Sequence, residues 1–336
     1  MKRLPASSTE RLAIPALAAL LLLCAAASLC VGAVRLAPGE AVRALLSGER
    51  QSVAARIVVY TRLPRTLSAM LCGGALAVAG AVIQTVLCNP LASPGILGVN
   101  ASAGLAVALC CALWPASASA APGIAFAGAL LGVLGVLLLS ELAGASRTTV
   151  LLSGVAASNL LGAAIDAVLT FAPDALAGYA SFKVGGFSGV TMARLAPAAA
   201  MILPCLLLTL TLARQMDVLA LGAETAQSLG LRVRPVRLLL LALSAALCGA
   251  AVSVSGLLGF VGLIVPHMMR RLVGGDSLRL TAACALGGAA LVTACDTLSR
   301  VIFAPYELPV GVVLSVAGVP FFLWLLLVRR GGHAHD

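Results

Sequence analysis

Two aspartates are the residues that could carry ion-coupling chemistry in this apolar chain. Asp166 and Asp296 each lie in a hydrophobic segment, where a carboxylate could bind a proton or a sodium ion during transport. Arg300 follows Asp296 by about one helical turn, so these two side chains can instead form an ion pair. The spacing favours pairing for Asp296 and leaves the role of Asp166 open.

Other reactive side chains do not combine into a catalytic or metal site. His267 has no second ligand at helical spacing, and the terminal HAHD stretch is expected to be a disordered end. Neither Lys2 nor Lys183 follows a glycine-rich phosphate-binding loop, so we expect no nucleotide site. The sequence shows no Ser-His-Asp, Cys-His or paired-carboxylate arrangement, so we expect no enzyme activity and no bound cofactor. The ten cysteines lack metal-ligand spacing and are expected to be reduced core residues.

These side chains must be positioned by helices that cross a membrane. Hydrophobic residues make up 61% of the 336 residues, charged residues make up 10%, and the mean hydropathy is +1.09. The uncharged run 66–140 is too long for one or two crossings of about 20 residues each. A β-barrel would show short alternating segments, which the sequence lacks. We therefore predict an all-α polytopic membrane protein with a single domain over residues 1–336.

The apolar runs predict about ten transmembrane helices. They lie near 12–34, 63–86, 95–113, 122–142, 149–171, 192–213, 234–257, 260–272, 278–302 and 308–328. Arginine clusters at the ends of these runs place both termini in the cytoplasm. The segment 35–65 opposes this rule, because as an external loop it would carry six arginines against two glutamates. It is either a tolerated exception or a docking surface for an acidic partner.

A proline-containing break interrupts the longest uncharged run. The stretch NPLASP, residues 89–94, ends one helix and reverses the chain, and Asn89 can satisfy the backbone groups that are freed. Irregular backbone at membrane depth must be buried in protein or face water. We therefore place this turn beside a cavity or at the inner surface.

The same region begins an internal repeat. CGGALAVAG at 72–80 resembles CGAAVSVSG at 248–256, and a proline and a glycine follow both copies in the same register. Under the ten-helix count the two copies run in opposite directions. This predicts an inverted repeat with halves at approximately 60–171 and 234–328, of the kind that lines transport paths. Chance similarity between Ala- and Gly-rich helices is the alternative.

An arginine-flanked loop at approximately 214–236 is predicted to be cytoplasmic. It contains a short helix, AETAQSLG, bracketed by Gly222 and Gly230, and Gly230 is well placed as its C-terminal cap. A short projecting helix suits docking into a groove of another protein. An ordinary loop with an interfacial helix is the alternative.

Together these motifs resemble the permease subunits of ABC importers for iron chelates, haem and cobalamin, the FecCD type. The matching stretches are RLPRTLSAML, CGGALAVAGAVIQTVLCNPLASPGILG, GLLGFVGLIVPHMMRRLVGGD, CDTLSR and ELPVGVVLSVAGVPFFLWLL, in the expected order. The resemblance implies a homodimer in the bacterial inner membrane that binds no nucleic acid. Its expected partners are two cytoplasmic ATP-binding subunits, an extracytoplasmic substrate-binding protein, and a siderophore, haem or cobalamin-like metal chelate as substrate. An ion-gradient-driven secondary transporter is the alternative.

The resemblance also implies three groups of functional positions. The residues expected to face outward and meet carboxylates of the binding protein are Arg62, Arg65 and Arg300. The residues expected at the translocation path or its inner gate are Gln84, Asn89, Leu91, Arg147 and Thr148. The residues expected to contact the ATPase are Gly222, Glu224, Gln227 and Gly230. Internal pairing with Asp296 is the alternative role for Arg300.

Overall fold

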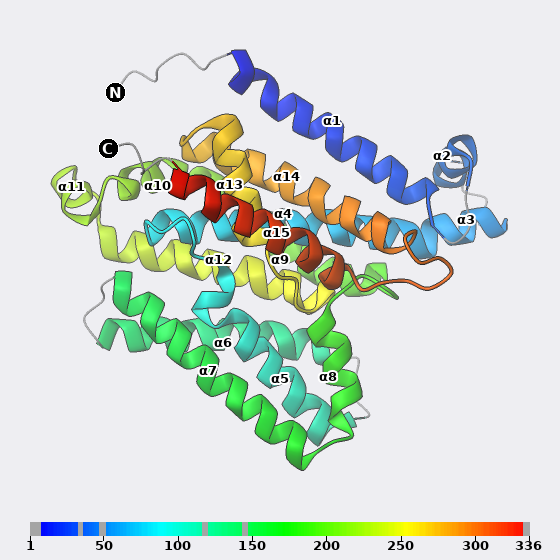
Figure 1. Cartoon of the computed structure of the whole chain (residues 1–336), viewed down its shortest axis with the longest axis horizontal. Coiled ribbons are helices and arrows are strands. Elements are labelled where there is room, and N and C mark those ends of the chain that lie inside the picture. The colour runs from blue at the N-terminus through cyan, green and yellow to red at the C-terminus, as the bar shows by residue number, and fades with distance from the viewer. Residues whose placement is uncertain (1–7, 33–35, 47–51, 116–119, 143–146, 332–336) are drawn as a thin grey trace.

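The computed structural model describes residues 8–32, 36–46, 52–115, 120–142 and 147–331, and all regular structure in these ranges is helical (Figure 1). The helices are α1 (Ser8–Cys30), α2 (Pro38–Leu46), α3 (Val53–Ile57), η1 (Val58–Arg62), α4 (Leu63–Val86), η2 (Pro94–Leu97), α5 (Val99–Leu113), α6 (Ala121–Leu142), α7 (Arg147–Phe171), α8 (Ala175–Val184), α9 (Met192–Thr211), α10 (Ala213–Ala220), α11 (Ala223–Ser228), α12 (Val233–Ser255), α13 (Val261–Val273), α14 (Ser277–Ser299) and α15 (Val310–Gly331). The terminal HAHD stretch lies outside the described residues.

The long helices confirm the prediction of an all-α polytopic membrane protein. Within the described residues, seven helices are long and apolar enough to cross a membrane, and the apolar segments Val99–Leu113 and Val310–Leu323 are shorter. With α13, a helix of 13 residues, these elements occupy the ten predicted segments. The short helices α2, α3 and α8 were not among the predicted segments.

One boundary in the sequence analysis is wrong. The segment 35–65 is not a loop throughout, because a continuous helical segment runs from Val53 to Val86. Its residues 58–62 form a π-helical turn directly before Pro64. Proline lacks an N–H for the preceding turn and its ring crowds the carbonyl there, and a widened turn relieves both problems. Arg65 therefore lies inside a long helix rather than at its start.

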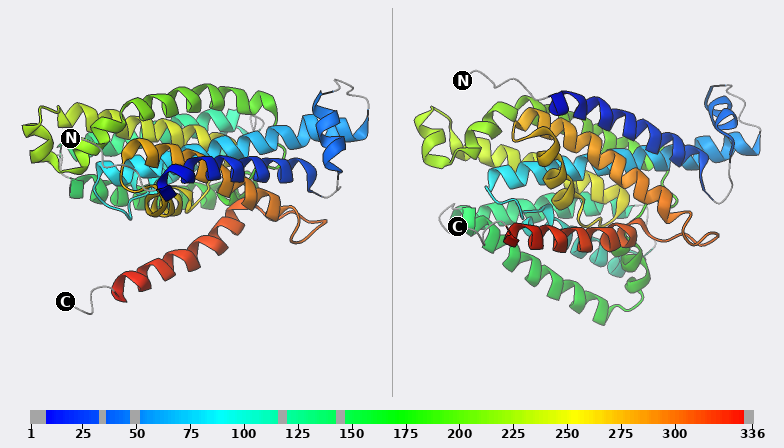
Figure 2. Two further views of the ribbon diagram at one scale, coloured as in Figure 1. Left: turned by 90° about the horizontal axis from the view of Figure 1, so that it is seen from above. Right: turned by 45° about the horizontal axis from the view of Figure 1, so that its top comes forward.

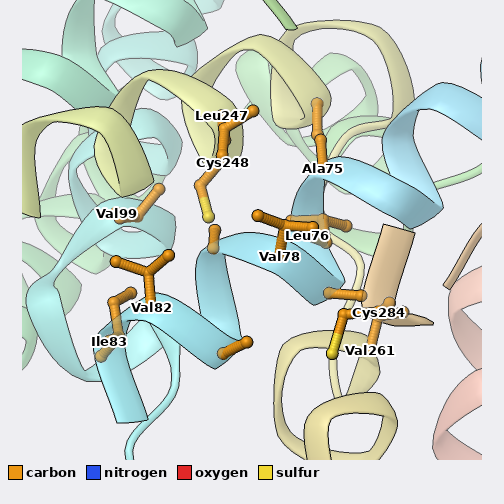
Figure 3. Close-up of a cluster of buried hydrophobic side chains, with 14 of the residues drawn as sticks. Ala75, Leu76, Val78, Val82, Ile83, Val99, Leu247, Cys248, Val261 and Cys284 are labelled. Carbon is orange, nitrogen blue, oxygen red and sulfur yellow. The ribbon is translucent and has the colours of Figure 1, made fainter. Parts of the chain in front are cut away.

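The core forms around α4, which is buried along most of its length. Figure 3 shows side chains of α4, including Leu76, Val78 and Val82, packed against residues of other helices. Leu247 and Cys248 come from α12, Val261 from α13 and Cys284 from α14; all are buried in the same cluster. The helix that carries the first copy of the repeat is thus the centre of the bundle.

Helix α4 approaches its neighbours closely because its sequence supplies glycine at the contacts. A Cβ at Gly80 would collide with the backbone of Gly262 in α13, and one at Gly73 would collide with the backbone of Gly288 in α14. Small residues of this kind let helix backbones approach each other in membrane proteins. The packing depends on the absence of side chains at these positions.

The bundle has two ends, which we name the α2 end and the α11 end. Figure 1 shows the start of α1 and the end of α15 at the α11 end, with α2, α3 and the loop between α14 and α15 at the opposite end. Helices α4 and α12, which carry the two repeat copies, are antiparallel neighbours. The thiol of Cys72 lies 3.6 Å from the backbone oxygen of Ala251 at their contact. The antiparallel arrangement is the one expected of an inverted repeat.

Helices α7 and α15, like α1, are weakly covered by the rest of the chain. Only 17% of the α7 span is buried inside the chain. Helix α15 diverges from the bundle along its length (Figure 2, left). It exposes a row of valines, Val312, Val316 and Val319. These two helices offer surface that the chain itself does not cover.

Candidate functional site

The charged groups at the α2 end come from elements that are far apart in the sequence. Arg62 and Arg65 lie on the helical segment leading into α4, Asp296 lies in the last turn of α14 and Arg300 follows it. Glu307 lies in the loop between α14 and α15. We call these five residues the charge cluster.

Arg65 is bound by two carboxylates. Its Nε donates to both carboxylate oxygens of Asp296, each at 3.0 Å. Its Nη1 donates to Oε2 of Glu307 at 2.7 Å. The Arg65 side chain is 8% exposed, Asp296 is fully buried and Glu307 is 38% exposed. Arg65 therefore has one internal anionic partner and one that is accessible from outside.

Arg300 holds α1 against α14. Its Nη2 lies 3.4 Å from Oδ2 of Asp296 and donates to the hydroxyl of Ser28 at 2.7 Å. Its Nη1 donates to the backbone oxygens of Ser28 and Val31, both at 3.2 Å. The guanidinium thus satisfies backbone carbonyls at the end of α1, where helical partners are missing, as well as the carboxylate of α14.

Arg62 is also turned inward. Its side chain is buried, and Nη1 donates to the backbone oxygen of Leu29 at 2.7 Å. The structure therefore does not show Arg62, Arg65 and Arg300 as outward-facing groups, because all three bind groups of the chain itself. Pairing of Arg300 with Asp296, the alternative in the sequence analysis, is present. A docking role for the three arginines stays a prediction.

A pocket of about 220 Å³ reaches the charge cluster from the α2 end. Arg65 and Glu307 form one side, together with the residues that lead into α15. The turn after α8, residues 184–188, forms the other side. We call it the Arg65 pocket. It joins the cluster to the stretch KVGGFSG, residues 183–189, which begins at the end of α8.

The break at NPLASP folds as the sequence predicts. Helix α4 ends at Val86, and Oδ1 of Asn89 accepts a hydrogen bond of 2.9 Å from the backbone N–H of Leu91. The N–H of Asn89 itself donates to the backbone oxygen of Gln84 at 3.0 Å. Leu91 is exposed at the turn. Asn89 therefore stabilises the reversal, and Leu91 is the side chain presented beside it.

Gln84 connects two helices inside the chain. Its Nε2 lies 3.4 Å from the backbone oxygens of Gly262 and Leu263, and its Oε1 accepts a hydrogen bond of 3.1 Å from Nη1 of Arg270. The side chain is buried. In this chain Gln84 thus links α4 to α13 instead of presenting its amide at the surface, and its role in a path stays a prediction.

The residues Arg147 and Thr148 begin α7. Thr148 is exposed, as are Asn159 and Asp166 farther along the helix. These three polar residues are separated by about three and two helical turns, so they lie on one face. The structure brings Thr148 and Asp166 together with a residue that the sequence analysis did not single out, Asn159.

The predicted coupling segment forms a compact projection at the α11 end. Helix α11 begins after Gly222 and ends in a Schellman motif, in which Gly230 N–H donates to Gln227 and Leu231 N–H donates to Ala226. Gly230 has a φ of 83°, as this cap requires. The prediction that Gly230 caps the helix is confirmed.

The surface of this projection combines apolar and charged side chains. Ala226 is buried and anchors α11, whereas Glu224 and Gln227 are exposed. Leu221 and Leu229 on either side of α11 are 54% and 62% exposed. Exposed leucines with a polar rim suit a protein contact. The role of this surface in ATPase binding stays a prediction.

Two features escaped the sequence analysis. Glu307 is the single acidic residue between Asp296 and the C-terminal residue, and an isolated acid beside an apolar helix is a signal for a buried partner. Arg194 lines a second pocket, of about 420 Å³, between α5, α8 and α12. Its Nη2 donates to the backbone oxygen of Ser253 at 3.2 Å.

Comparison with known proteins shows one consistent similarity. The sequence model of the FecCD transport family matches residues 20–328. A hemin transport system permease protein of Yersinia pestis is 42% identical over 279 residues, 80% of this chain and 82% of that protein. A ferric enterobactin transport system permease protein of Escherichia coli is 38% identical over 331 residues, 96% and 98% of the two chains.

The fold is also similar to a solved structure. That structure shows an inward-facing conformation of a transporter assigned to the metal-chelate ABC type. The TM-score is 0.81 at 27% sequence identity, and the match covers 94% of this chain and 98% of the solved chain. The similarity therefore extends over the whole helical bundle.

Proposed function

Since the chain belongs to the FecCD transport family, we propose that two copies of it form a path through which a metal chelate enters the cytoplasm. The chain is a multi-span permease subunit of an ABC importer and not an enzyme. Family membership favours ATP-driven import over the ion-gradient alternative. ATP is bound by separate subunits, and the permease itself holds no cofactor.

The exposed polar residues of α7 are the observation that supports the proposed translocation path. Thr148, Asn159 and Asp166 lie on this face, in a helix that is long and apolar enough to span the membrane. An exposed carboxylate and an exposed amide facing lipid tails would each be costly, whereas both are well solvated beside water. A water-filled path between two α7 helices would solvate them.

A second copy of the chain would complete this path. Helix α7 is little covered within one chain, and α15 diverges from the bundle (Figure 2, left). Two-fold symmetric pairing is the commonest way for a membrane or soluble protein to bury such a surface. The homodimer places the polar faces of both α7 helices toward one axis.

We assign the α11 end to the cytoplasm. Arg270, Arg271 and Arg279 lie near this end, in agreement with the excess of positive charge in cytoplasmic loops. The projection with Glu224, Leu221 and Leu229 is then the ATPase contact. The α2 end, with the charge cluster, faces the binding protein. Both termini are cytoplasmic.

The names of the relatives support a proposal for the substrate class. The two permeases described above are named for hemin and for ferric enterobactin, and others of 39% and 41% identity are named for ferric dicitrate and achromobactin. We propose an iron–siderophore complex or haem as the cargo of this chain. A cobalamin-like chelate is the second candidate within the same class.

Reconstitution tests this proposal. The permease is placed in liposomes with an ATPase subunit and a substrate-binding protein from the same organism, and uptake is measured for ferric siderophores, haem and cobalamin. We expect uptake of one chelate that requires ATP, the ATPase and the binding protein together. Uptake by the permease alone, driven by a proton or sodium gradient, would refute the proposal.

A further inference from the structure

We propose that Glu307 is an internal substitute for a carboxylate of the binding protein. In the free permease the Glu307 carboxylate is ion-paired with the Arg65 guanidinium. It leaves Arg65 when an external carboxylate enters the Arg65 pocket, a step that we call carboxylate exchange. The inference rests on the proposed function, because it assumes that a binding protein docks at the α2 end. It also reconciles a docking role for Arg65 with the internal bonds that the structure shows.

The two carboxylates that bind Arg65 are held very differently. Asp296 is fully buried in α14 and also binds Arg300. Its departure would therefore remove a negative partner from two buried guanidinium groups. Glu307 is 38% exposed, lies in a loop and binds Arg65 through a single contact of 2.7 Å. Glu307 is therefore the replaceable partner, and Asp296 is the permanent one.

The Arg65 pocket gives an external group access to this contact. It has a volume of about 220 Å³ and is lined by both Arg65 and Glu307. A carboxylate on a protein side chain needs only a fraction of that space. Arg65 and Glu307 both line the pocket and are joined through Nη1 of Arg65, so we infer that an entering carboxylate would bind the same Nη1 donor.

Exchange keeps the charge balance of the cluster unchanged. Arg62, Arg65 and Arg300 carry three positive charges, and Asp296 and Glu307 carry two negative charges. An entering carboxylate that takes the place of Glu307 on Arg65 preserves this balance, and the released Glu307 is solvated at its partly exposed position.

Exchange would also change the outer turn beside the pocket. Gly311 in the first turn of α15 lies so close to Val184 that a Cβ at Gly311 would collide with the Val184 backbone oxygen. Glu307 sits in the loop that leads into this contact, and Leu308 N–H donates to the backbone oxygen of Ser299 at 3.0 Å. Release of Glu307 removes the ionic tie between this loop and α4. Docking would thereby loosen the loop that holds the start of α15 against the turn after α8.

The test compares two charge-removing substitutions at the same end of the bundle. Glu307→Gln removes the internal competitor and keeps the side-chain shape. Glu40→Gln removes an equal charge from the exposed surface of α2, where the carboxylate binds the backbone N–H of Ala37. Affinity for the cargo-loaded binding protein used in the reconstitution is measured in nanodiscs. We expect Glu307→Gln to tighten binding about three- to tenfold and Glu40→Gln to leave it nearly unchanged.

Carboxyl footprinting of the unmodified permease provides a second measurement that does not depend on a variant. Glu307 is labelled with a carbodiimide and an amine, with and without the binding protein, and the label is quantified by mass spectrometry. We expect docking to increase labelling of Glu307 and to leave buried Asp296 unlabelled. The binding protein could bind without changing the labelling of Glu307, and Glu307→Gln could bind it with the affinity of the unmodified permease. In that case the proposed carboxylate exchange is wrong and the importer assignment stands. If no binding protein binds and no ATP-dependent uptake occurs, the proposed function fails and exchange fails with it.

Discussion

Arg65 Nε lies 3.0 Å from both carboxylate oxygens of Asp296, a residue 231 positions away in the chain. This contact joins the helix at the centre of the bundle to α14 at the α2 end. Both side chains are almost completely removed from solvent. Loss of one partner of a buried ion pair leaves an uncompensated charge, so the contact makes the fold sensitive to single substitutions here.

Asp296→Asn should destabilise the protein strongly. The substitution removes the negative charge that binds both Arg65 and Arg300 in a buried environment. Breaking such a pair costs about 3–5 kcal/mol. We expect a clearly lower midpoint of thermal unfolding in detergent and poor recovery from membranes.

Asp166→Asn is the matched control for this prediction. It makes the same chemical change at an exposed position on α7. We expect its unfolding midpoint to stay close to that of the unmodified protein. Equal midpoints for the two variants would show that the Asp296 pairs contribute little to stability.

Gly80→Ala should disturb the packing of α4 on α13. The added Cβ would collide with the backbone oxygen of Gly262, and a backbone group cannot rotate away. Forcing extra atoms into a packed core costs about 1–3 kcal/mol. Gly135→Ala in α6 is the control, because a Cβ there meets no atom within 4 Å. We expect lower thermal stability for the first variant and unchanged or slightly higher stability for the second.

Asn159→Cys should react with a charged, water-soluble maleimide in nanodiscs. The side chain lies on the polar face of α7, which we assign to the path. The adjacent Leu160 is 73% exposed but points to a different face of the helix, where lipid is expected. Leu160→Cys should therefore stay unlabelled when the modified peptides are read by mass spectrometry. Labelling of Leu160→Cys but not Asn159→Cys would reverse the assignment of the two faces.

Leu229→Asp should weaken binding of the ATPase subunits. Leu229 is 62% exposed beside α11 and would be buried by a partner groove. Loss of a buried leucine side chain costs about 1.5–3 kcal/mol, or roughly a tenfold or greater loss of affinity. Glu224→Arg is expected to reduce coupling of ATP hydrolysis to uptake at the same contact.

Val53→Asp is the control for the ATPase surface. Val53 is also apolar and exposed, but it begins α3 at the α2 end. We expect this variant to bind the ATPase normally, as measured by co-purification, and both leucine and valine variants to retain the permease dimer. Normal ATPase binding by Leu229→Asp would place the contact elsewhere on the α11 end.

The sequence alone determined the features that depend on neighbouring residues. The long apolar runs define the membrane helices because each must satisfy its own backbone hydrogen bonds. Asn89 closes the turn after α4, and Gly230 caps α11, through contacts that span only a few positions. Such contacts depend on the types of residues close together in the sequence, so they can be predicted without the tertiary structure.

Tertiary structure decided which groups these helices bring together. The sequence offered Asp296 as a partner for Arg300 one turn away, but the contacts of Arg65 with Asp296 and Glu307 required α4, α14 and the loop before α15 to meet. Packing also decided that Arg65 lies inside a continuous helix and that Asn159 joins Asp166 on an uncovered face. The sequence records the same residue, arginine, whether its side chain faces water or a buried carboxylate. Only the position of groups hundreds of residues away distinguishes the two, because charge pairing acts through space and not along the chain.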